Sequence, residues 1–464
     1  MKSSRYVVLI SLIALLSACS NKEETSSTVS SSESSDPSIS ISTYEGTPLL
    51  PKHPLLPVYS YSFPHISKDE MPIGAWVAPW RVGEKNFQTI EQYRTIKEAG
   101  LNTIYGLYES YGLNTPYVFD ALSLAEQAGI GYLVRDGSLG AYSEDIDEFK
   151  SHMDQYTAYS SFAGILAVDE PGSNQFPSLG VQRKMMRQYY TKYAYYVNTF
   201  PTYASSAQFS GDTDSDMGYD EYASLFLDTV QPQMFSFDYY GVSGEAPNIS
   251  EGYFEQIYKV KTFADSHRIP FWPFIQACSY GGRSRIPTKE EIYWQVGANL
   301  VYGAKGIQYF CYQTPAEAGD WGGNFIDYNG NKTALFPYFQ MANSFISSID
   351  AILMNSTLVD MIKTGEGIVP TPENQTFVSS SRELSSVEST SPVLVGVFSN
   401  EGKTVLYVFN NSTTDASMID LSFSSLVDAS IYTFAAAQAE TALNKITISL
   451  KAGESALVEI TNYQ

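Results

Sequence analysis

The chain has 464 residues, which is long enough for a large core and for two domains. Its 50 acidic residues outnumber its 28 lysines and arginines, and the formal net charge of −22 argues against nucleic acid as a partner and against an anionic membrane surface as a target. The four histidines follow no metal-binding spacing, so we expect no metal site, no cofactor and no Ser-His-Asp hydrolase.

Residues 1–19 have the pattern of an export signal. Lys2 and Arg5 precede an apolar run that is too short to span a membrane as an ordinary helix. The run ends in Leu16-Ser17-Ala18-Cys19, which resembles the lipobox of bacterial lipoproteins and implies that Cys19 carries a lipid. A plain secretory signal with an incidental Cys19 is the alternative. We therefore expect an exported protein, lipid-anchored at the extracellular face of a bacterial cell membrane, with residues 20–45 as a disordered Ser-rich tether.

Residues 46–354 alternate between buried-strand and helical patterns. Apolar residues at helical spacing follow each strand pattern, as from Ile90 to Ala99, where Gly100 is placed to cap the helix. Another helix is predicted to run as far as Tyr196, because tyrosines recur along it at helical spacing. Eight such units without a Gly-rich phosphate loop predict a (β/α)₈ barrel, and a doubly wound sheet is the alternative. The eight strands are expected to begin near Ile73, Leu101, Ile130, Ala163, Thr202, Gln233, Phe271 and Gly306.

The helical spacing stops near Asn355. Short alternating segments separated by turn residues follow it, such as those at 393–398 and 404–409. They predict a small antiparallel β-sandwich over 355–464.

Two cysteines remain in the mature chain, Cys278 and Cys311, and both fall on neighbouring predicted strands. Two cysteines are too few for a disulfide framework. Buried free thiols are the preferred interpretation and a single bridge is the alternative.

The most informative segment is the fourth predicted strand, Gly164 to Gly172. It is a continuous apolar run that ends in Asp169 and Glu170, as expected for a strand buried in a parallel sheet. Pro171 disfavours a helical conformation for Glu170, so we expect this residue to be extended. Acids at the carboxyl end of such a strand lie where barrels place their chemistry. The alternative is that Asp169 merely caps the next helix.

Carboxylates, amides and aromatic side chains follow the other predicted strands as well. Acids and amides bind hydroxyl groups, and aromatic rings pack on the apolar faces of sugars. The sequence therefore predicts a carbohydrate substrate, with a subsite formed by Trp76, Tyr108, Asp136, Tyr239, Tyr240, Gln276 and Tyr312.

The region from Ile73 to Leu353 resembles the barrels of glycoside hydrolases, and the C-terminal region resembles their accessory domains. In the large retaining clan the acid/base Glu ends strand four, and Glu170 matches that position. The clan usually has Asn before this Glu, where this chain has Asp169. The clan's nucleophilic Glu ends strand seven, but that strand ends here with Gln276 and contains no acid.

Two sources of a second catalytic group remain. Asp238, after strand six, is one, although it is equally a candidate for binding a substrate hydroxyl. The other source is Asp169, because the Asp169-Glu170 pair resembles that of substrate-assisted N-acetylhexosaminidases. In that pattern Glu is the acid, Asp orients the acetamido group of the substrate, and a tyrosine such as Tyr239 or Tyr240 holds its oxygen.

We therefore expect a surface-anchored glycoside hydrolase with Glu170 as the general acid and Asp169 or Asp238 as the second carboxylate. A non-catalytic glycan-binding lipoprotein on a barrel scaffold is the main alternative, favoured by Gln276 and disfavoured by the acid pair. A two-lobed solute-binding lipoprotein is the third possibility, which one closed barrel would exclude.

Overall fold

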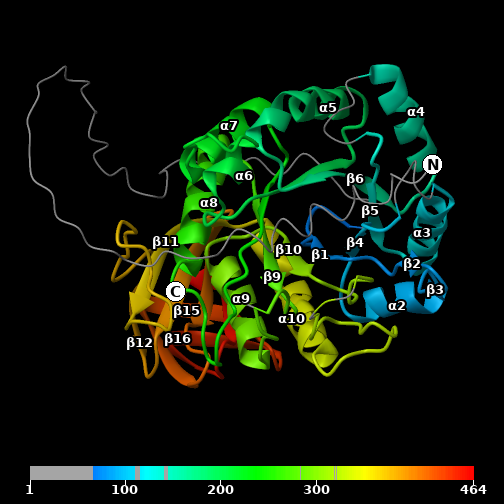
Figure 1. Ribbon diagram of the computed structural model, residues 1–464. Coiled ribbons are helices and arrows are strands. Elements are labelled where there is room, and N and C mark those ends of the chain that lie inside the picture. The colour runs from blue at the N-terminus through cyan, green and yellow to red at the C-terminus, as the bar shows by residue number, and fades with distance from the viewer. Residues whose placement is uncertain are drawn as a thin grey trace, which may run out of the picture. The chain divides into compact units, whose positions relative to one another are not determined.

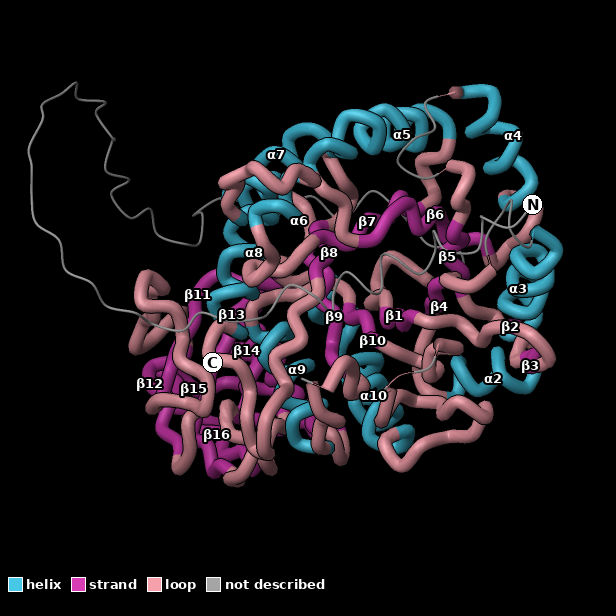
Figure 2. Tube along the Cα trace, viewed as in Figure 1, coloured by secondary structure: helices cyan, strands magenta, loops and turns pink. Residues whose placement is uncertain are grey.

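The computed structural model describes residues 66–109, 115–139, 145–282, 284–317, 319 and 321–463. Cys19 and the predicted tether lie outside these residues. Eight parallel strands form a closed barrel in the order β1-β4-β5-β6-β7-β8-β9-β10, because β1 pairs with both β4 and β10 (Figure 2). Their bounds are β1 Ile73–Trp76, β4 Thr103–Tyr105, β5 Gly131–Arg135, β6 Phe162–Asp169, β7 Ala194–Thr199, β8 Phe235–Phe237, β9 Phe271–Gln276 and β10 Ile307–Phe310.

The barrel prediction is confirmed, and the doubly wound sheet and the two-lobed alternative are excluded. Helices between the strands surround the barrel (Figure 1). No helix among the described residues is long and apolar enough to cross a membrane. The helices are α2 Ile90–Glu98, α3 Thr115–Ala128, α4 Ile146–Tyr156, α5 Phe176–Tyr189, α6 Ser206–Ser210, α7 Tyr219–Val230, α8 Tyr253–His267, α9 Lys289–Val301 and α10 Phe336–Met354, with a 3₁₀ turn η1 at Ser173–Gln175 and a hairpin of β2 Arg81–Val82 and β3 Lys85–Asn86.

The fifth strand differs from the prediction. It is β7, Ala194–Thr199, which we expected to be the end of a helix, whereas the segment near Thr202 forms no strand. The preceding helix stops at Tyr189, and β7 is then filled with the β-branched and aromatic residues that strands favour. The segment after Thr202 instead forms α6, which Ser205 and Gln208 start with a capping box. Tyrosines at helical spacing were therefore misleading, because a buried strand is apolar on both faces.

The C-terminal region is antiparallel, as predicted. Hydrogen bonds connect all seven strands, in the order β11-β13-β14-β17-β15-β12 with β16 on β15. The long β15 pairs with β12 through its first half and with β17 through its second half, so the strands share one hydrophobic core. The bounds are β11 Thr357–Thr364, β12 Leu384–Ser389, β13 Val393–Asn400, β14 Lys403–Asn410, β15 Ser417–Thr433, β16 Ala437–Leu450 and β17 Ser455–Tyr463.

The C-terminal strands pack directly on the last two barrel helices. Phe434 stacks on Phe345 of α10 with ring centroids 4.4 Å apart. The indole N–H of Trp294 in α9 donates to Asn411 Oδ1 at 2.9 Å. This buried contact braces the side of the barrel formed by α9 and α10.

Candidate active site

A bulge in β6 directs Asp169 into the barrel. Leu166 pairs with Tyr196 of β7, but Val168 pairs with the next residue of β7, so Ala167 is skipped. Without this extra residue, strict alternation would point Asp169 outward, because Leu166 points inward. The bulge restores an inward direction, and Asp169 therefore lies opposite Asn198 of β7.

The same two strands approach each other unusually closely at Gly164. A Cβ atom there would lie 2.1 Å from the carbonyl oxygen of Ala194, and the φ of Gly164 is 148°. Any side chain would therefore push β7 away from β6. This glycine holds together the two strands that carry Asp169 and Asn198.

Glu170 is not extended, contrary to our prediction. Its φ is +46°, a left-handed conformation that is rare for residues other than glycine. Pro171 disfavours the right-handed helical region for the residue before it, and Glu170 adopts the left-handed region instead of the extended one. The N–H of Glu170 donates to the carbonyl of Asn198 at 2.9 Å. Such strained residues concentrate at functional sites.

The helix-cap alternative for Asp169 is excluded. The helical segments after β6 are η1 and α5, whose N-caps are Gly172 and Gln175. The Asp169 side chain is instead bonded to Asn198, at the barrel mouth.

Asn198 joins two carboxylates. Its side-chain amide donates to Asp169 Oδ1 at 3.2 Å and to Asp238 Oδ1 at 3.0 Å. Ser236 donates to its Oδ1 at 3.2 Å, which fixes the amide with its N–H groups toward the acids. The Ser236 hydroxyl is in turn 2.6 Å from the Tyr196 hydroxyl. The sequence did not reveal Asn198, because a helix was predicted as far as Tyr196 and the fifth strand only from Thr202, which left Asn198 between them.

The pKa values of Asp169, Glu170 and Asp238 are all raised. Burial raises the pKa of Asp169 to about 6, although the Asn198 hydrogen bond and Arg135 lower it. Burial and the charge of Asp169 raise the pKa of Asp238 to about 8. Burial, then Asp238 and Asp169, raise the pKa of Glu170 well above its usual range. Glu170 Oε1 is also buried without a hydrogen-bond partner in the protein. Glu170 and Asp238 are therefore the acids whose protonated forms are favoured, and Glu170 Oε1 has no partner within the protein.

Aromatic side chains surround these acids. Tyr240 and Tyr280 pack edge to face with centroids 5.4 Å apart. Burial and the charge of Asp238 raise the pKa of both tyrosines, and Glu170 adds to the effect at Tyr280. Trp76 lies deeper, where its indole packs 6.2 Å from Phe274. Of the predicted subsite residues, Tyr240 is the one whose ionisation both Asp169 and Asp238 oppose.

Asp136 binds the framework of the protein. Its carboxylate, 1% exposed, accepts hydrogen bonds from the Tyr156 hydroxyl at 2.5 Å and from Ser138 Oγ at 2.6 Å. It also accepts from the backbone of Ser138 and Leu139 and lies 2.7 Å from His152 Nδ1. These contacts fix the loop after β5 to α4.

Gln276 also binds the framework. Its Oε1 accepts from the Val242 N–H at 2.9 Å, and its Nε2 donates to the carbonyls of Val242, Cys278 and Arg285 at 3.0, 3.2 and 3.1 Å. Gln276, at the end of β9, the seventh strand of the barrel, thus ties together the loops after β8 and β9. Its side-chain oxygen and nitrogen both have hydrogen-bond partners in these loops.

Three of the tyrosines predicted to form the subsite have hydroxyl groups that are hydrogen-bonded within the protein. The Tyr239 hydroxyl lies 2.8 Å from Ser250 Oγ, and that of Tyr312 donates to the Gln92 carbonyl at 3.4 Å. The Tyr108 hydroxyl bonds to Glu317 in the loop after β10. Cys278 and Cys311 are buried free thiols.

The sequence matches no protein-family model and no curated protein. Among solved structures, the chain is similar to a β-galactosidase from Bacillus circulans sp. alkalophilus, with a TM-score of 0.58 and 7% identity over 86% of this chain and 99% of that one. It is also similar to a glycoside hydrolase of family 5 from Bacteroides vulgatus, with a TM-score of 0.50 and 12% identity over 84% of this chain and 89% of that one. At these identities the similarity shows a shared fold, the (β/α)₈ barrel.

Proposed function

We propose that this chain is a glycoside hydrolase and that Glu170 is its general acid. The observation that carries the proposal is the place of the Glu170 carboxyl group at the mouth of the barrel, where burial and two neighbouring acids favour its protonated form. Glycoside cleavage needs such a group, because the leaving oxygen must receive a proton. The free Oε1 is available for that contact.

The second carboxylate is Asp169 or Asp238. Asp169 has the lower pKa, about 6, because Asn198 and Arg135 favour its charged form. At neutral pH it is the ionised member of the group, suited to stabilise positive charge at the sugar carbon or to orient a substrate amide. Asp238 shares the Asn198 amide, and because its pKa is raised to about 8 it is suited at neutral pH to bind a hydroxyl group and only at higher pH to act as a base.

The proposed location is the outer face of a bacterial cell membrane, with a lipid on Cys19. The support is the pattern of residues 1–19 alone. Metabolic labelling with a fatty acid tests it, and a Cys19→Ala chain is expected to lose the label. Equal labelling of both chains would contradict the anchor.

The test of the activity is release of reducing sugar from natural bacterial, plant and host glycans, N-acetylated ones included. We expect Glu170→Gln to lower the rate by about 10²–10⁴-fold, the usual contribution of a general acid. Glu109→Gln is the matched control, because Glu109 is also a buried Glu with a pKa raised to about 8 and one oxygen without a partner, but its other oxygen bonds to Tyr132 and it follows β4. Equal loss in both variants would contradict a specific role for Glu170.

The second candidate function is binding of glycans without cleavage. Gln276 favours it, because the end of β9, where the retaining clan has its nucleophilic Glu, holds an amide that is bound to loop carbonyls. Glycans that bind wild type and Glu170→Gln alike, with no sugar released from any of them, would establish this alternative.

A further inference from the structure

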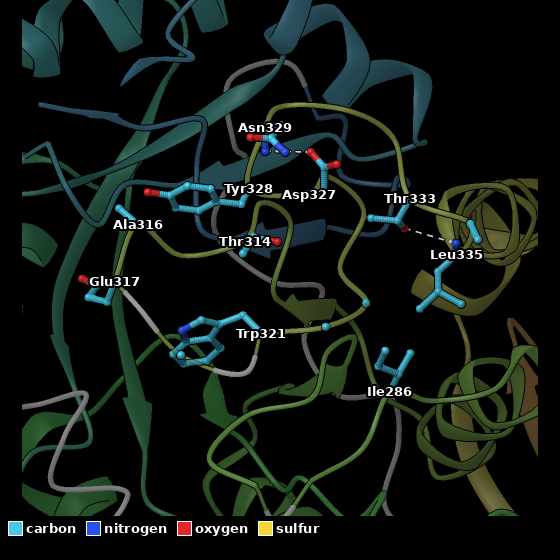
Figure 3. A pocket seen from close by; sticks show the side chains of 14 residues that line it. Ile286, Thr314, Ala316, Glu317, Trp321, Asp327, Tyr328, Asn329, Thr333 and Leu335 are labelled. Carbon is cyan, nitrogen blue, oxygen red and sulfur yellow. Dashed lines mark hydrogen bonds between the residues drawn. The ribbon is translucent and has the colours of Figure 1, made fainter. Parts of the chain in front are cut away.

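A cavity lies in the loop that follows the last strand of the barrel. The long loop between β10 and α10, together with Ile286, lines a cavity of about 890 Å³, within the range of about 300–1,000 Å³ that is typical of ligand sites. Figure 3 shows Tyr328 and Trp321 above and below Thr314, with Ile286 and Leu335 across the cavity. The loop follows the carboxyl end of β10, the eighth strand of the barrel. The cavity therefore opens on the same face of the barrel as Glu170.

A strip of aromatic rings connects the cavity to the acids. Trp321 lies 6.3 Å from Tyr280 at an interplanar angle of 31°, and Tyr280 lies 5.4 Å from Tyr240. Asp238 raises the pKa of both tyrosines, which indicates that their hydroxyl groups lie near this acid. Rings in such a row offer successive apolar surfaces to successive sugar rings.

The far side of the cavity is held in place before any ligand arrives. Lys85 Nζ lies 3.6 Å from the centroid of the Tyr328 ring and donates to the Tyr328 carbonyl at 3.1 Å. Trp80 packs against the same ring at 5.7 Å. Tyr328 nevertheless keeps 43% of its surface exposed, so it is a rigid ring that still has room for a partner.

The charge of the lining selects the type of ligand. Glu317 and Asp327 are acidic, and no described lining residue is Lys, Arg or His. Because the whole chain carries −22, an anionic polysaccharide would be repelled. A neutral chain of sugars fits both the aromatic strip and this charge.

We propose that the cavity binds further sugar units of a neutral polysaccharide whose bond is cleaved at Glu170, so that the substrate is a long chain and not a terminal disaccharide. The inference rests on the proposed function for the class of ligand, carbohydrate. Trp321 and Tyr328 are the binding residues it names.

The test is retardation in native gels that contain galactomannan, xyloglucan, xylan or glycol chitin. The parent is the full chain with Glu170→Gln, which we expect to hydrolyse the polysaccharide about 10²–10⁴-fold more slowly than wild type. We compare Trp321→Ala and Tyr328→Ala with Tyr189→Ala. Tyr189 of α5 is a control matched to Tyr328. It is 41% exposed, and Lys150 Nζ lies 3.8 Å from the centroid of its ring, but it belongs to a helix that does not line the cavity.

We expect at least one polysaccharide to retard the parent and each cavity variant to weaken that binding by roughly 2- to 12-fold, the factor for an aromatic contact. Tyr189→Ala should bind like the parent, and thermal unfolding should show all chains folded. Equal retardation of all variants, or no retardation of the parent by any of the four, would overturn the inference. Cavity-dependent binding without hydrolysis by wild type would support the cavity as a polysaccharide site and would remove cleavage at Glu170, and with it the proposed function. Hydrolysis by wild type, together with binding that the cavity variants leave unchanged, would support the proposed function and overturn the inference about the cavity.

Discussion

Asp238 should cost the protein stability at neutral pH. Its pKa is raised to about 8 in the folded chain from an ordinary 3.8, so the folded state holds a proton that the unfolded state releases. Stability is therefore lost as pH rises from about 4 to about 8. At about 1.4 kcal/mol per pKa unit, the penalty is about 1.7 kcal/mol at pH 5 and up to about 5 kcal/mol at pH 7.5. Asp238→Asn removes the charge but can still accept the Asn198 hydrogen bond.

Urea unfolding of wild type and Asp238→Asn at the two pH values measures this difference. We expect the variant to be more stable at both, with a gain larger by about 3 kcal/mol at pH 7.5. Asp136→Asn is the matched control, because Asp136 is as buried but accepts hydrogen bonds from several donors. It should lose about 1.5–3 kcal/mol, since its new amide faces donors. A gain for Asp238→Asn that did not grow with pH would refute the electrostatic cause.

Two further predictions concern the geometry of the acids. Asn198→Ala removes the donor shared by Asp169 and Asp238, so their pKa values should rise and the acidic limb of the activity profile should move to higher pH; an unmoved limb would mean that neither acid sets it. Gly164→Ala should destabilise the chain by about 1–3 kcal/mol and lower activity, because its Cβ meets the backbone of the next strand. Gly218→Ala, which meets nothing within 4 Å, is the control, and equal unfolding midpoints of the two would contradict the close approach.

The barrel could be predicted because each of its strands is a short apolar run followed by polar residues. Such runs gave seven of the eight strands, including β6 with its terminal acids. The exception, β7, shows the limit of the method. Its tyrosines point alternately into the barrel and toward α5, as Tyr196 and Tyr195 do, so both faces are apolar and spacing cannot distinguish strand from helix.

The candidate site was predictable only to the level of the acids. Which side chains face the mouth depends on details that no pattern displays, such as the skipped Ala167 in β6 and the left-handed Glu170. Polar residues after strands are also needed to hold loops together, and Asp136 serves that purpose. Residue type and position at a strand end therefore identify candidates, whereas hydrogen-bond partners decide among them.

Gln276 shows why the absence of an acid at the end of β9 does not by itself decide between a hydrolase and a binding protein. A carboxylate at this position would place its oxygens against the three carbonyls that now accept from the Gln276 amide, which would be repulsive. The loops after β8 and β9 therefore require an amide there. The acids are instead gathered around Asn198, with Asp169 from β6 on one side and Asp238 after β8 on the other. Because these two strands flank β7, the cluster offers two candidates for the proposed second carboxylate, and its chemistry would follow from which of the two acids is ionised when Glu170 is protonated.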